Sequence, residues 1–345
     1  MTEKMKAIGM YEYRPTEDPE SLVDVELPKP KAEGRDILVE VKAVSVNPVD
    51  TKVRGRKEPA RDVPHVFGYD AAGVVAETGP EVTLFKPGDE VFYAGDITRP
   101  GTNQEYHLVD ERIVALKPRT LDFADAASLP LTAITAWELL FDRLGVPYGR
   151  KTGQGSLLII NGAGGVGSIL IQIARRLTGL TVIATASREE SVAWVRRMGA
   201  HHVINHHEPL DEQLKAIGVP EVDYVASLTA SDRNLAIFPT IIAPQGRLAL
   251  IDDPAAFDIK PLKTKAISVH WELMFTRPMF GTADMIEQHR LLSEVAALVD
   301  DGLLVATKTQ ELTPINAEQL RAAHAIQESA RAIGKTVLVG FPSSA

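Results

Sequence analysis

Hydrophobic and polar positions change their spacing along the chain. In the first 130 residues, short β-branched runs at 38–46 and 71–76 are separated by turn signals such as Lys86-Pro87-Gly88-Asp89. Short strands with frequent turns are typical of a barrel-like domain. This part of the chain is therefore predicted to be rich in β-structure.

From about residue 132, apolar runs of roughly four to six residues alternate with helical patterns of roughly ten to fifteen. Such alternation predicts a parallel sheet with crossover helices. The expected strands are 157–161, 181–185, 203–205, 224–227 and 247–252. The end of the chain returns to a mixed pattern. There we expect helices at 283–300 and 317–333, and strands at 308–312 and 336–339.

Composition narrows the class of protein. A chain of 345 residues predicts two domains, and 45% hydrophobic with 24% charged residues is ordinary for a globular protein. The net charge of −9 without a basic stripe disfavours nucleic acid as a partner, so a small molecule is expected. The absence of cysteine excludes disulfides and thiolate ligands. No secretory signal and no apolar run of about 18 residues are seen, which predicts a cytoplasmic protein without a membrane span.

A glycine-rich turn carries most of the functional signal. It follows an apolar strand, 156–161, and precedes an amphipathic helix, 168–178. Strand, turn and helix together predict a dinucleotide site, in which backbone N–H groups at the start of the helix face a pyrophosphate. The predicted cofactor-binding residues of the turn are Gly162, Ala163, Gly164, Gly165, Val166 and Gly167.

The end of the next strand indicates which dinucleotide binds. An NAD site needs a carboxylate there for the ribose 2′-hydroxyl, but Ala186 stands at the expected position. Ser187 and Arg188 could instead donate to a 2′-phosphate, which favours NADPH. Arg188 could alternatively be a solvated residue of the following helix. His206 is a further candidate for the adenosine end, or a surface residue without a role.

Several motifs, in order and spacing over nearly the whole chain, resemble the medium-chain dehydrogenase/reductase superfamily. Within it, the chain is similar to the zinc-free quinone oxidoreductase (zeta-crystallin-like) branch, whose members are often labelled zinc-type alcohol dehydrogenase-like. The motifs are Val46-Asn47-Pro48-Val49-Asp50, Gly68-Tyr69-Asp70-Ala71-Ala72-Gly73-Val74-Val75, Lys86-Pro87-Gly88-Asp89-Glu90-Val91, the segment 126–140 and the glycine turn.

The resemblance implies an α/β fold that combines a doubly wound parallel Rossmann sheet with a GroES-like β-barrel. Residues 1–130 would form the GroES-like substrate domain, 131–275 the Rossmann NADPH-binding domain, and 276–345 the return to the substrate domain. The resemblance also implies a homodimer. By position in the family motifs, Asn47 should face the nicotinamide, and Thr135 should touch the nicotinamide or its ribose-phosphate.

The same comparison implies that the catalytic zinc is missing. Zinc enzymes of the superfamily have cysteine where Asn47 stands, and histidine and glutamate where Tyr69 and Asp70 stand. A zinc site needs about three converging ligands, which Asp70 alone cannot supply. The nine histidines show no recognisable metal spacing, so no metal residues are predicted.

Without a metal to polarise a carbonyl, hydride delivery from NADPH to a quinone or an activated C=C is favoured over alcohol oxidation. Lys52 could donate a hydrogen bond to the developing oxyanion, or Asp50 and Lys52 could form only a loop ion pair. Tyr69 is the second candidate donor, with a packing role as its alternative. An apolar substrate pocket, or simply core, could be formed by Trp137, Trp271, Phe275 and Met279.

The sequence therefore predicts an NADPH-dependent reductase of quinones, enones or enals. Two other readings stay open. The chain could be a non-enzymatic NADPH-binding protein with a structural or redox-sensing role, or it could be an enoyl-thioester reductase.

Overall fold

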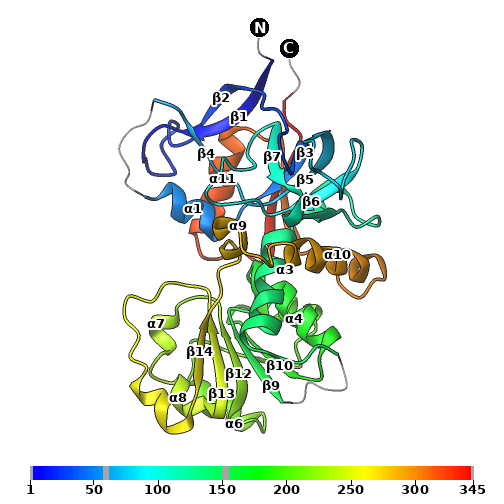
Figure 1. Cartoon of the computed structure of the whole chain (residues 1–345). Coiled ribbons are helices and arrows are strands. Elements are labelled where there is room, and N and C mark those ends of the chain that lie inside the picture. Colours follow the sequence, from blue (N-terminus) through cyan, green and yellow to red (C-terminus); the bar gives the residue numbers. More distant parts are fainter. Residues whose placement is uncertain (1–2, 57–61, 150–154, 343–345) are drawn as a thin grey trace. The chain divides into compact units, whose positions relative to one another are not determined.

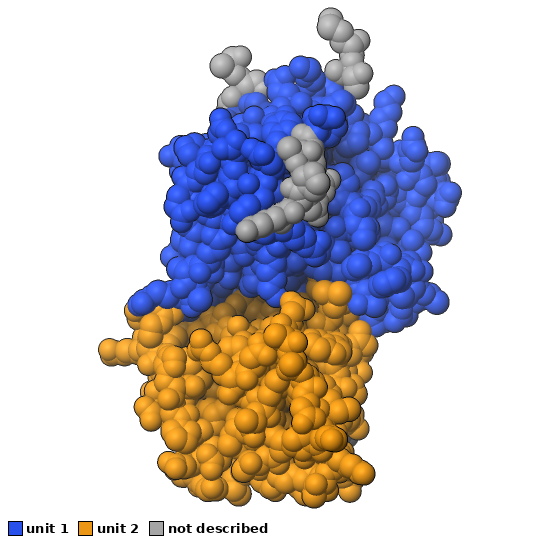
Figure 2. All heavy atoms as spheres, turned by 90° about the vertical axis from the view of Figure 1, so that its left-hand side faces the viewer, with its two compact units in different colours: residues 1–131, 275–345 blue, residues 132–274 orange. Residues whose placement is uncertain are grey.

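The computed structural model describes residues 3–56, 62–149 and 155–342. It divides into two compact units. The first unit joins the two ends of the chain, Met1–Leu131 and Phe275–Ala345, and the second is Thr132–Met274 (Figure 1, Figure 2). None of the helices in the described ranges is long and apolar enough to cross a bilayer.

The first unit is built mainly from antiparallel strands, which lie in two described sheets. A three-stranded sheet has the order β2-β1-β4, and a larger one has the order β15-β16-β3-β5-β6-β8, with β7 paired to β3. The strands are β1 Lys4–Met10, β2 Val23–Pro28, β3 Asp36–Ser45, β4 His65–Val66, β5 Ala71–Thr78, β6 Glu90–Tyr93, β7 Tyr106–Asp110, β8 Val114–Leu116, β15 Lys308–Leu312 and β16 Lys335–Val339. Because β16 pairs with β3, residues 337–339 lie beside residues 43–45.

Helices of the first unit flank these strands. They are α1 Pro48–Arg54, the 3-10 helix η1 Glu111–Ile113, α2 Phe123–Ala127, α9 Thr276–Phe280, α10 Glu287–Asp300 and α11 Ala317–Glu328. The helix α1 packs against α11. Its N-terminus follows β3 directly, and Pro48 occupies a first-turn position, where its missing N–H costs no helical hydrogen bond.

The second unit contains a parallel sheet with the strand order β11-β10-β9-β12-β13-β14. Its strands are β9 Ser156–Ile160, β10 Thr181–Thr185, β11 His202–Ile204, β12 Val222–Ser227, β13 Ile242–Leu250 and β14 Ser268–Trp271. The chain moves outward from β9 to β11, then returns to β12 on the other side of β9. The carboxyl ends of β9 and β12 therefore form the topological switch point, where ligands of open α/β sheets bind.

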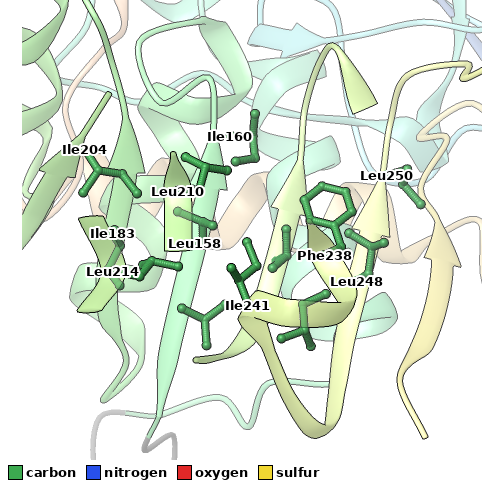
Figure 3. Packing of buried hydrophobic residues seen from close by; sticks show 13 residues of the cluster. Leu158, Ile160, Ile183, Ile204, Leu210, Leu214, Phe238, Ile241, Leu248 and Leu250 are labelled. Atoms are coloured by element: carbon green, nitrogen blue, oxygen red, sulfur yellow. The ribbon is translucent and has the colours of Figure 1, made fainter. Parts of the chain in front are cut away.

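Helices cover both faces of this sheet. They are α3 Pro130–Trp137, which begins at the last residues of the first unit, the π-helix η2 Glu138–Arg143, α4 Gly165–Leu177, α5 Glu189–Met198, α6 Leu210–Ala216, α7 Ser231–Asn234, α8 Phe238–Ile241 and the 3-10 helix η3 Lys260–Lys265. α4 and α5 pack together, while α6 and α8 contribute Leu214 and Phe238 to a core that includes Leu158 and Ile183 of the strands (Figure 3). The parallel sheet buried under helices confirms the predicted Rossmann α/β class.

Some expected element ends were wrong. The helix expected at 168–178 begins inside the glycine turn, at Gly165, because Gly164 takes the N-cap position. The helix expected at 317–333 ends at Glu328, since Ala330 adopts a left-handed backbone conformation with φ +55°. The helix expected at 283–300 begins only at Glu287. The edge strand β14 was not anticipated, because its four residues, Ser-Val-His-Trp, carry no clear apolar run.

Candidate functional site

The glycine turn lies at the carboxyl end of β9, next to the switch point of the sheet. Asn161 leaves the strand with φ +67°, and Gly164 caps α4. A Cβ on Gly162 would lie 2.7 Å from the Ala184 Cβ, and one on Gly167 would lie 2.4 Å from the Asn161 carbonyl oxygen. These two glycines are thus required by the packing of the chain itself.

Backbone hydrogen bonds separate the roles of the turn residues. The N–H of Gly162 donates to the Thr185 carbonyl at 3.0 Å, so it is not available to a ligand. The first N–H that bonds back into α4 belongs to Ser168, which donates to Gly164 at 2.9 Å. The preceding N–H groups therefore point out of the N-terminus of α4, which is also the positive end of the helix dipole. This arrangement suits an anion.

The end of β10 carries the residues expected to recognise the adenosine ribose. Ala186 is buried, and its N–H donates to the Ile204 carbonyl at 2.9 Å. Ser187 and Arg188 are half-buried, and Arg188 caps α5. The first carboxylates after the strand are Glu189 and Glu190, which are exposed on the first turn of α5. No acidic side chain stands at the Ala186 position itself.

His206 follows β11 and is exposed. Its ring packs against His207 with centroids 4.5 Å apart. Partial burial, with His207 and Arg233 as further causes, lowers the pKa of His206. At neutral pH the ring is therefore uncharged, so any contact with a phosphate would be a hydrogen bond and not an ion pair.

Thr135 is buried in α3, which continues into the π-helix η2.

A cluster of charged residues that the sequence did not indicate includes residues of η2. The Arg143 Nε donates to the Glu272 carboxylate at 2.8 Å. The Glu138 carboxylate lies near the same guanidinium group, at a longer distance. Burial, with the negative charge of Glu138 as the second cause, raises the pKa of Glu272 to about 9. The two glutamates therefore hold a proton between them at neutral pH.

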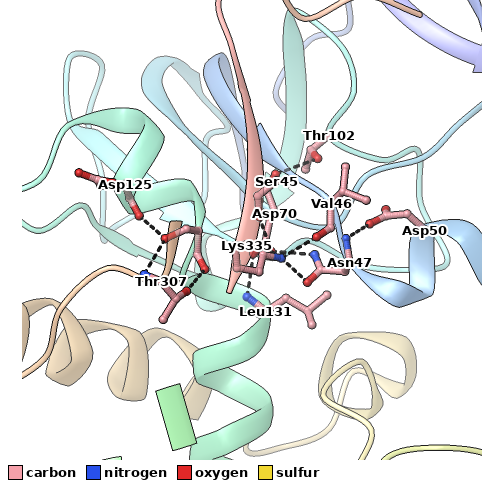
Figure 4. Close-up of polar contacts among 11 residues, drawn as sticks. Ser45, Val46, Asn47, Asp50, Asp70, Thr102, Asp125, Leu131, Thr307 and Lys335 are labelled. Atoms are coloured by element: carbon pink, nitrogen blue, oxygen red, sulfur yellow. Dashed lines mark hydrogen bonds and ion pairs between the residues drawn. The ribbon is translucent and has the colours of Figure 1, made fainter. Parts of the chain in front are cut away.

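A buried polar cluster in the first unit is centred on Asp70 (Figure 4). Its Oδ2 accepts from the Ser45 hydroxyl at 2.9 Å, the Asn47 Nδ2 at 2.7 Å and the Lys335 Nζ at 2.9 Å. Its Oδ1 accepts from the Leu131 N–H at 2.8 Å. Asp70 and Lys335 are 0% and 3% exposed, so this is an ion pair shielded from water.

Lys335 also orients Asn47. Its Nζ donates to the Val46 carbonyl at 2.9 Å and to the Asn47 Oδ1. The Asn47 carboxamide is thus held at its oxygen by Lys335 and at its nitrogen by Asp70, which leaves one Nδ2–H for another partner. The contribution of Lys335 had no local signal, since it is a single lysine before an apolar strand far from Asn47 in sequence.

A catalytic zinc does not fit this cluster. The Asp70 carboxylate is engaged by an ammonium group, which would repel a divalent cation. Its neighbours Asn47 and Tyr69 offer no thiolate or imidazole. Within residues 3–56, 62–149 and 155–342, no three His, Cys, Asp or Glu side chains gather in a way that could hold a metal ion.

Tyr69 and Asp50 are two further buried polar residues of the first unit. Tyr69 is 1% exposed, and its ring packs edge-on against Phe275 at 5.2 Å. The buried Asp50 accepts the Asn47 N–H through Oδ2 at 2.6 Å. Within the described part of the chain, neither the Tyr69 hydroxyl nor the Asp50 Oδ1 has a hydrogen-bond partner. Burial raises the pKa of Asp50 to about 7, and its bond to the Asn47 backbone opposes the shift.

Lys52 has two candidate roles, as the ion-pair partner of Asp50 and as a hydrogen-bond donor to the substrate. Lys52 is exposed on α1, whereas Asp50, two residues earlier, points inward. Residues two apart on a helix face different directions. The Asp50 carboxylate accepts the Asn47 N–H, and its pairing with Lys52 stays a prediction. The role of Lys52 as a hydrogen-bond donor stays a prediction.

The four predicted pocket residues are divided between the two units. Trp137 packs against Phe141 at 5.0 Å in the second unit, where Trp271 is 53% exposed at the end of β14. In the first unit, Phe275 is buried against Tyr69, and Met279 is half-buried on α9. For Trp137 and Phe275 the structure thus shows aromatic packing.

Comparisons with known proteins cover both units. Residues 33–119 match the family model described as Alcohol dehydrogenase GroES-like domain, and residues 165–293 match that described as Zinc-binding dehydrogenase. The chain is 43% identical to a zinc-type alcohol dehydrogenase-like protein of Staphylococcus aureus, over 97% of this chain and 99% of the relative. It is 39% identical to an NADPH-dependent alkenal/one oxidoreductase of Arabidopsis thaliana, over 51% of this chain and 46% of the relative.

Solved structures share the whole fold. A putative zinc-dependent alcohol dehydrogenase protein from Rhizobium etli is 58% identical with a TM-score of 0.95, covering 99% of this chain and 100% of that one. A quinone oxidoreductase from Coxiella burnetii is 26% identical with a TM-score of 0.79, covering 98% of this chain and 100% of that one.

Proposed function

We propose a specific activity for this chain, which belongs to the medium-chain dehydrogenase/reductase superfamily and is an oxidoreductase. In this proposal it uses NADPH, without zinc, to reduce quinones or the activated C=C bonds of enones and enals. The observation that carries the proposal is the Lys335 ammonium on the Asp70 carboxylate, which stands where the family resemblance implies a glutamate in the zinc enzymes. A reductase of this kind needs less electrophilic help than an alcohol dehydrogenase.

The proposed cofactor site lies at the glycine turn. The N–H groups at the start of α4 would hold the pyrophosphate, and Gly164 would let the backbone approach it. Ser187 and Arg188 would donate to the 2′-phosphate, where the absence of a carboxylate at Ala186 avoids repulsion. Thr135 and the remaining Asn47 amide hydrogen are proposed for the nicotinamide end, and His206 for the adenosine end. The alkenal relative, whose name includes NADPH, supports this choice.

When bound, the cofactor supplies a hydride. The task of the chain is then to stabilise the negative charge that develops on the substrate oxygen. Tyr69 is the proposed donor, because its buried hydroxyl has no hydrogen-bond partner among the residues that the structure describes. Lys52 is the alternative donor, and its exposed position on α1 makes its contribution dependent on how a substrate approaches.

The cofactor and substrate class can be tested in one assay. Purified protein is supplied with NADPH or NADH and with a benzoquinone, an α,β-unsaturated ketone, an enoyl thioester or a primary alcohol with the oxidised cofactor. We expect turnover of the quinone or the enone with NADPH at least tenfold faster than with NADH. Equal use of NADH, or alcohol oxidation only after zinc addition, would overturn the proposal.

The same assay separates the other two readings. Tight NADPH binding without turnover of any substrate would identify a binding or sensing protein. A preference for the enoyl thioester over quinone and enone would identify an enoyl-thioester reductase.

We also propose that the chain forms a homodimer. β14 ends the described order of the second sheet, so one edge of it is open, and Trp271 and Leu273 beside it are 53% and 51% exposed. An open edge with apolar neighbours favours pairing with another strand. Light scattering should give twice the 37.5 kDa chain mass, and a monomer at micromolar concentration would contradict the proposal.

A further inference from the structure

A chain of hydrogen bonds runs from the helix α5 to the glycine turn of the second unit. The Trp194 Nε1–H donates to the Ser168 hydroxyl oxygen at 2.8 Å. The Ser168 hydroxyl in turn donates to the Gly164 carbonyl at 2.7 Å, with a longer contact of 3.4 Å to the Ala163 carbonyl. The Ser168 hydroxyl therefore gives its single hydrogen to the turn and accepts the indole hydrogen through its oxygen.

The side chains of this hydrogen-bonded chain are shielded from water. Ser168 is 0% exposed in α4, and Trp194 is 7% exposed in α5, the helix that packs against α4. The Arg197 guanidinium lies over the Trp194 ring, 4.3 Å from its centroid, in a cation–π contact. The indole is thus held by its own helix on one hand and by an acceptor on the neighbouring helix on the other.

A serine at this position of α4 does not improve the helix itself. The three residues that follow it, 169–171, are apolar and buried. A serine hydroxyl that bonds back to the carbonyl four residues earlier slightly destabilises a helix, whereas an alanine would not. The Ser168 hydroxyl therefore indicates a use at the turn to which it donates.

The hydrogen bonds act on the peptide that joins Gly164 to Gly165. Its carbonyl accepts from the Ser168 N–H at 2.9 Å as well as from the Ser168 hydroxyl. In a planar trans peptide, the C=O and the N–H that follows it point in opposite directions. Two donors that hold the carbonyl toward α4 therefore direct the Gly165 N–H out of the N-terminus of the helix, where an anion is favoured.

Packing restrains this peptide less than the rest of the turn. A Cβ on Gly167 would lie 2.4 Å from the Asn161 carbonyl oxygen, whereas a Cβ on Gly164 would meet only the side chain of Asn161, at 3.0 Å. Glycine also loses more conformational freedom on ordering than any other residue. The direction of the Gly165 N–H therefore depends on the hydrogen bonds that hold the Gly164 carbonyl.

We infer that Trp194 and Ser168 are positioning residues of the cofactor site, which hold the Gly165 N–H toward the cofactor pyrophosphate. The inference rests on the proposed function. Trp194 acts through Ser168, and Ser168 acts through the Gly164 carbonyl. Because NADPH and NADH share the pyrophosphate, both residues should matter equally for the two cofactors. In this they differ from Arg188, which is proposed for the 2′-phosphate alone.

The test compares the binding of NADPH, NADH and adenosine 2′-phosphate, which carries the 2′-phosphate but no pyrophosphate. W194F keeps an aromatic ring and loses the N–H, and S168A loses the hydroxyl. In either variant, calorimetry should show Kd raised about tenfold for NADPH and NADH, as expected for one lost hydrogen bond. Kd for adenosine 2′-phosphate should stay unchanged. R188A should give the opposite pattern, with weaker NADPH and adenosine 2′-phosphate and unchanged NADH.

A double variant tests whether Trp194 acts through Ser168. W194F/S168A should bind NADPH as S168A alone does, since the first substitution already breaks the chain, and additive losses of affinity would contradict the inference. S293A is the matched control. Its hydroxyl also donates to the carbonyl four residues earlier, that of His289, at 2.7 Å, but on an exposed part of α10. S293A should bind all three ligands as wild type does.

A second measurement uses the wild-type chain. In protein labelled with ¹⁵N at its three tryptophans, the Trp194 indole resonance is assigned by elimination with W137F and W271F. It should shift when NADPH or NADH binds, because the pyrophosphate polarises the hydrogen-bonded chain, and should stay in place with adenosine 2′-phosphate. An unmoved Trp194 resonance at saturating NADPH would overturn the inference even if W194F and S168A failed to fold.

The remaining outcomes separate the inference from the proposed function. Unchanged NADPH affinity in W194F and S168A, or an equal loss for all three ligands, would overturn the positioning role and leave the reductase proposal intact. The equal loss would identify a purely structural contact between α4 and α5. A wild-type chain that binds neither NADPH nor NADH would instead overturn the proposed function, and the positioning role with it.

Discussion

Lys335 and Asp70 form a buried ion pair, with the lysine Nζ 2.9 Å from the aspartate Oδ2. The two residues are far apart in sequence, and they meet because β3 pairs with β16 on one side and on the other with β5, the strand that follows Asp70. Asn47, Ser45 and Val46 supply the remaining hydrogen bonds of the pair. The pair thus joins the end of the chain to the segment that carries Asn47.

Replacing Lys335 by Met should strongly destabilise the protein. The Asp70 charge would remain buried without its cation, which costs about 3–5 kcal/mol. Denaturant unfolding should show this loss. The double variant with Asp70→Asn should recover part of it. Lys4→Met, which breaks the exposed pair with Glu26, is the control and should cost at most about 1 kcal/mol. Equal effects of the two lysine variants would contradict the structural role of Lys335.

Two glycines of the turn should respond differently to alanine. In Gly167→Ala, the new Cβ meets the Asn161 carbonyl oxygen at 2.4 Å, so stability should fall by a few kcal/mol. In Gly164→Ala, the nearest atom is the Asn161 Nδ2 at 3.0 Å, which can move. Gly164→Ala should therefore fold but bind NADPH at least tenfold more weakly. Thermal unfolding and fluorescence titration with NADPH distinguish the two effects, and unchanged binding in Gly164→Ala would argue against the pyrophosphate site.

Cofactor choice should depend on the end of β10. Ala186→Asp places a carboxylate where the 2′-phosphate is proposed to bind, so kcat/KM for NADPH should fall at least tenfold relative to NADH. Arg188→Ala should weaken NADPH and leave NADH nearly unchanged, since only the phosphate loses a donor. Steady-state kinetics with both cofactors measure the ratio. If Arg188→Ala lowered both equally, the arginine would act on the fold or on a shared part of the cofactor.

Asp50 should make stability depend on pH. Its pKa is about 7 in the folded chain against 3.8 for an ordinary aspartate, so the folded state holds the proton more tightly. The stability contribution of Asp50 is therefore greatest below pH 4 and is lost as pH rises to about 7. Relative to wild type, D50N should gain on the order of 4 kcal/mol between pH 4 and pH 8. Urea unfolding at several pH values, with D62N as control, measures the difference; a constant difference would contradict the buried, proton-binding state of Asp50.

The sequence predicted what depends on neighbours along the chain. The strand-glycine-helix order around Gly162 and Gly167 is a local feature, so the Rossmann class follows from it. The lack of an acid at Ala186 is local too, and the choice of NADPH that it favours stays a prediction. Element ends were less predictable. α11 stops early because Ala330 turns left-handed, which no residue-type preference indicates.

Only the tertiary structure determined the polar interior of the first unit. The sequence alone indicated that Asn47, Tyr69 and Asp70 are not a zinc site, but not that Lys335 occupies the Asp70 carboxylate. It left open whether Lys52 pairs with Asp50 or donates to a substrate, whereas folding turned Asp50 inward and left Lys52 exposed. The physical reason is that residue types determine which charges a chain carries, while burial and pairing with distant segments determine which of those charges are neutralised, shifted in pKa or left without a partner.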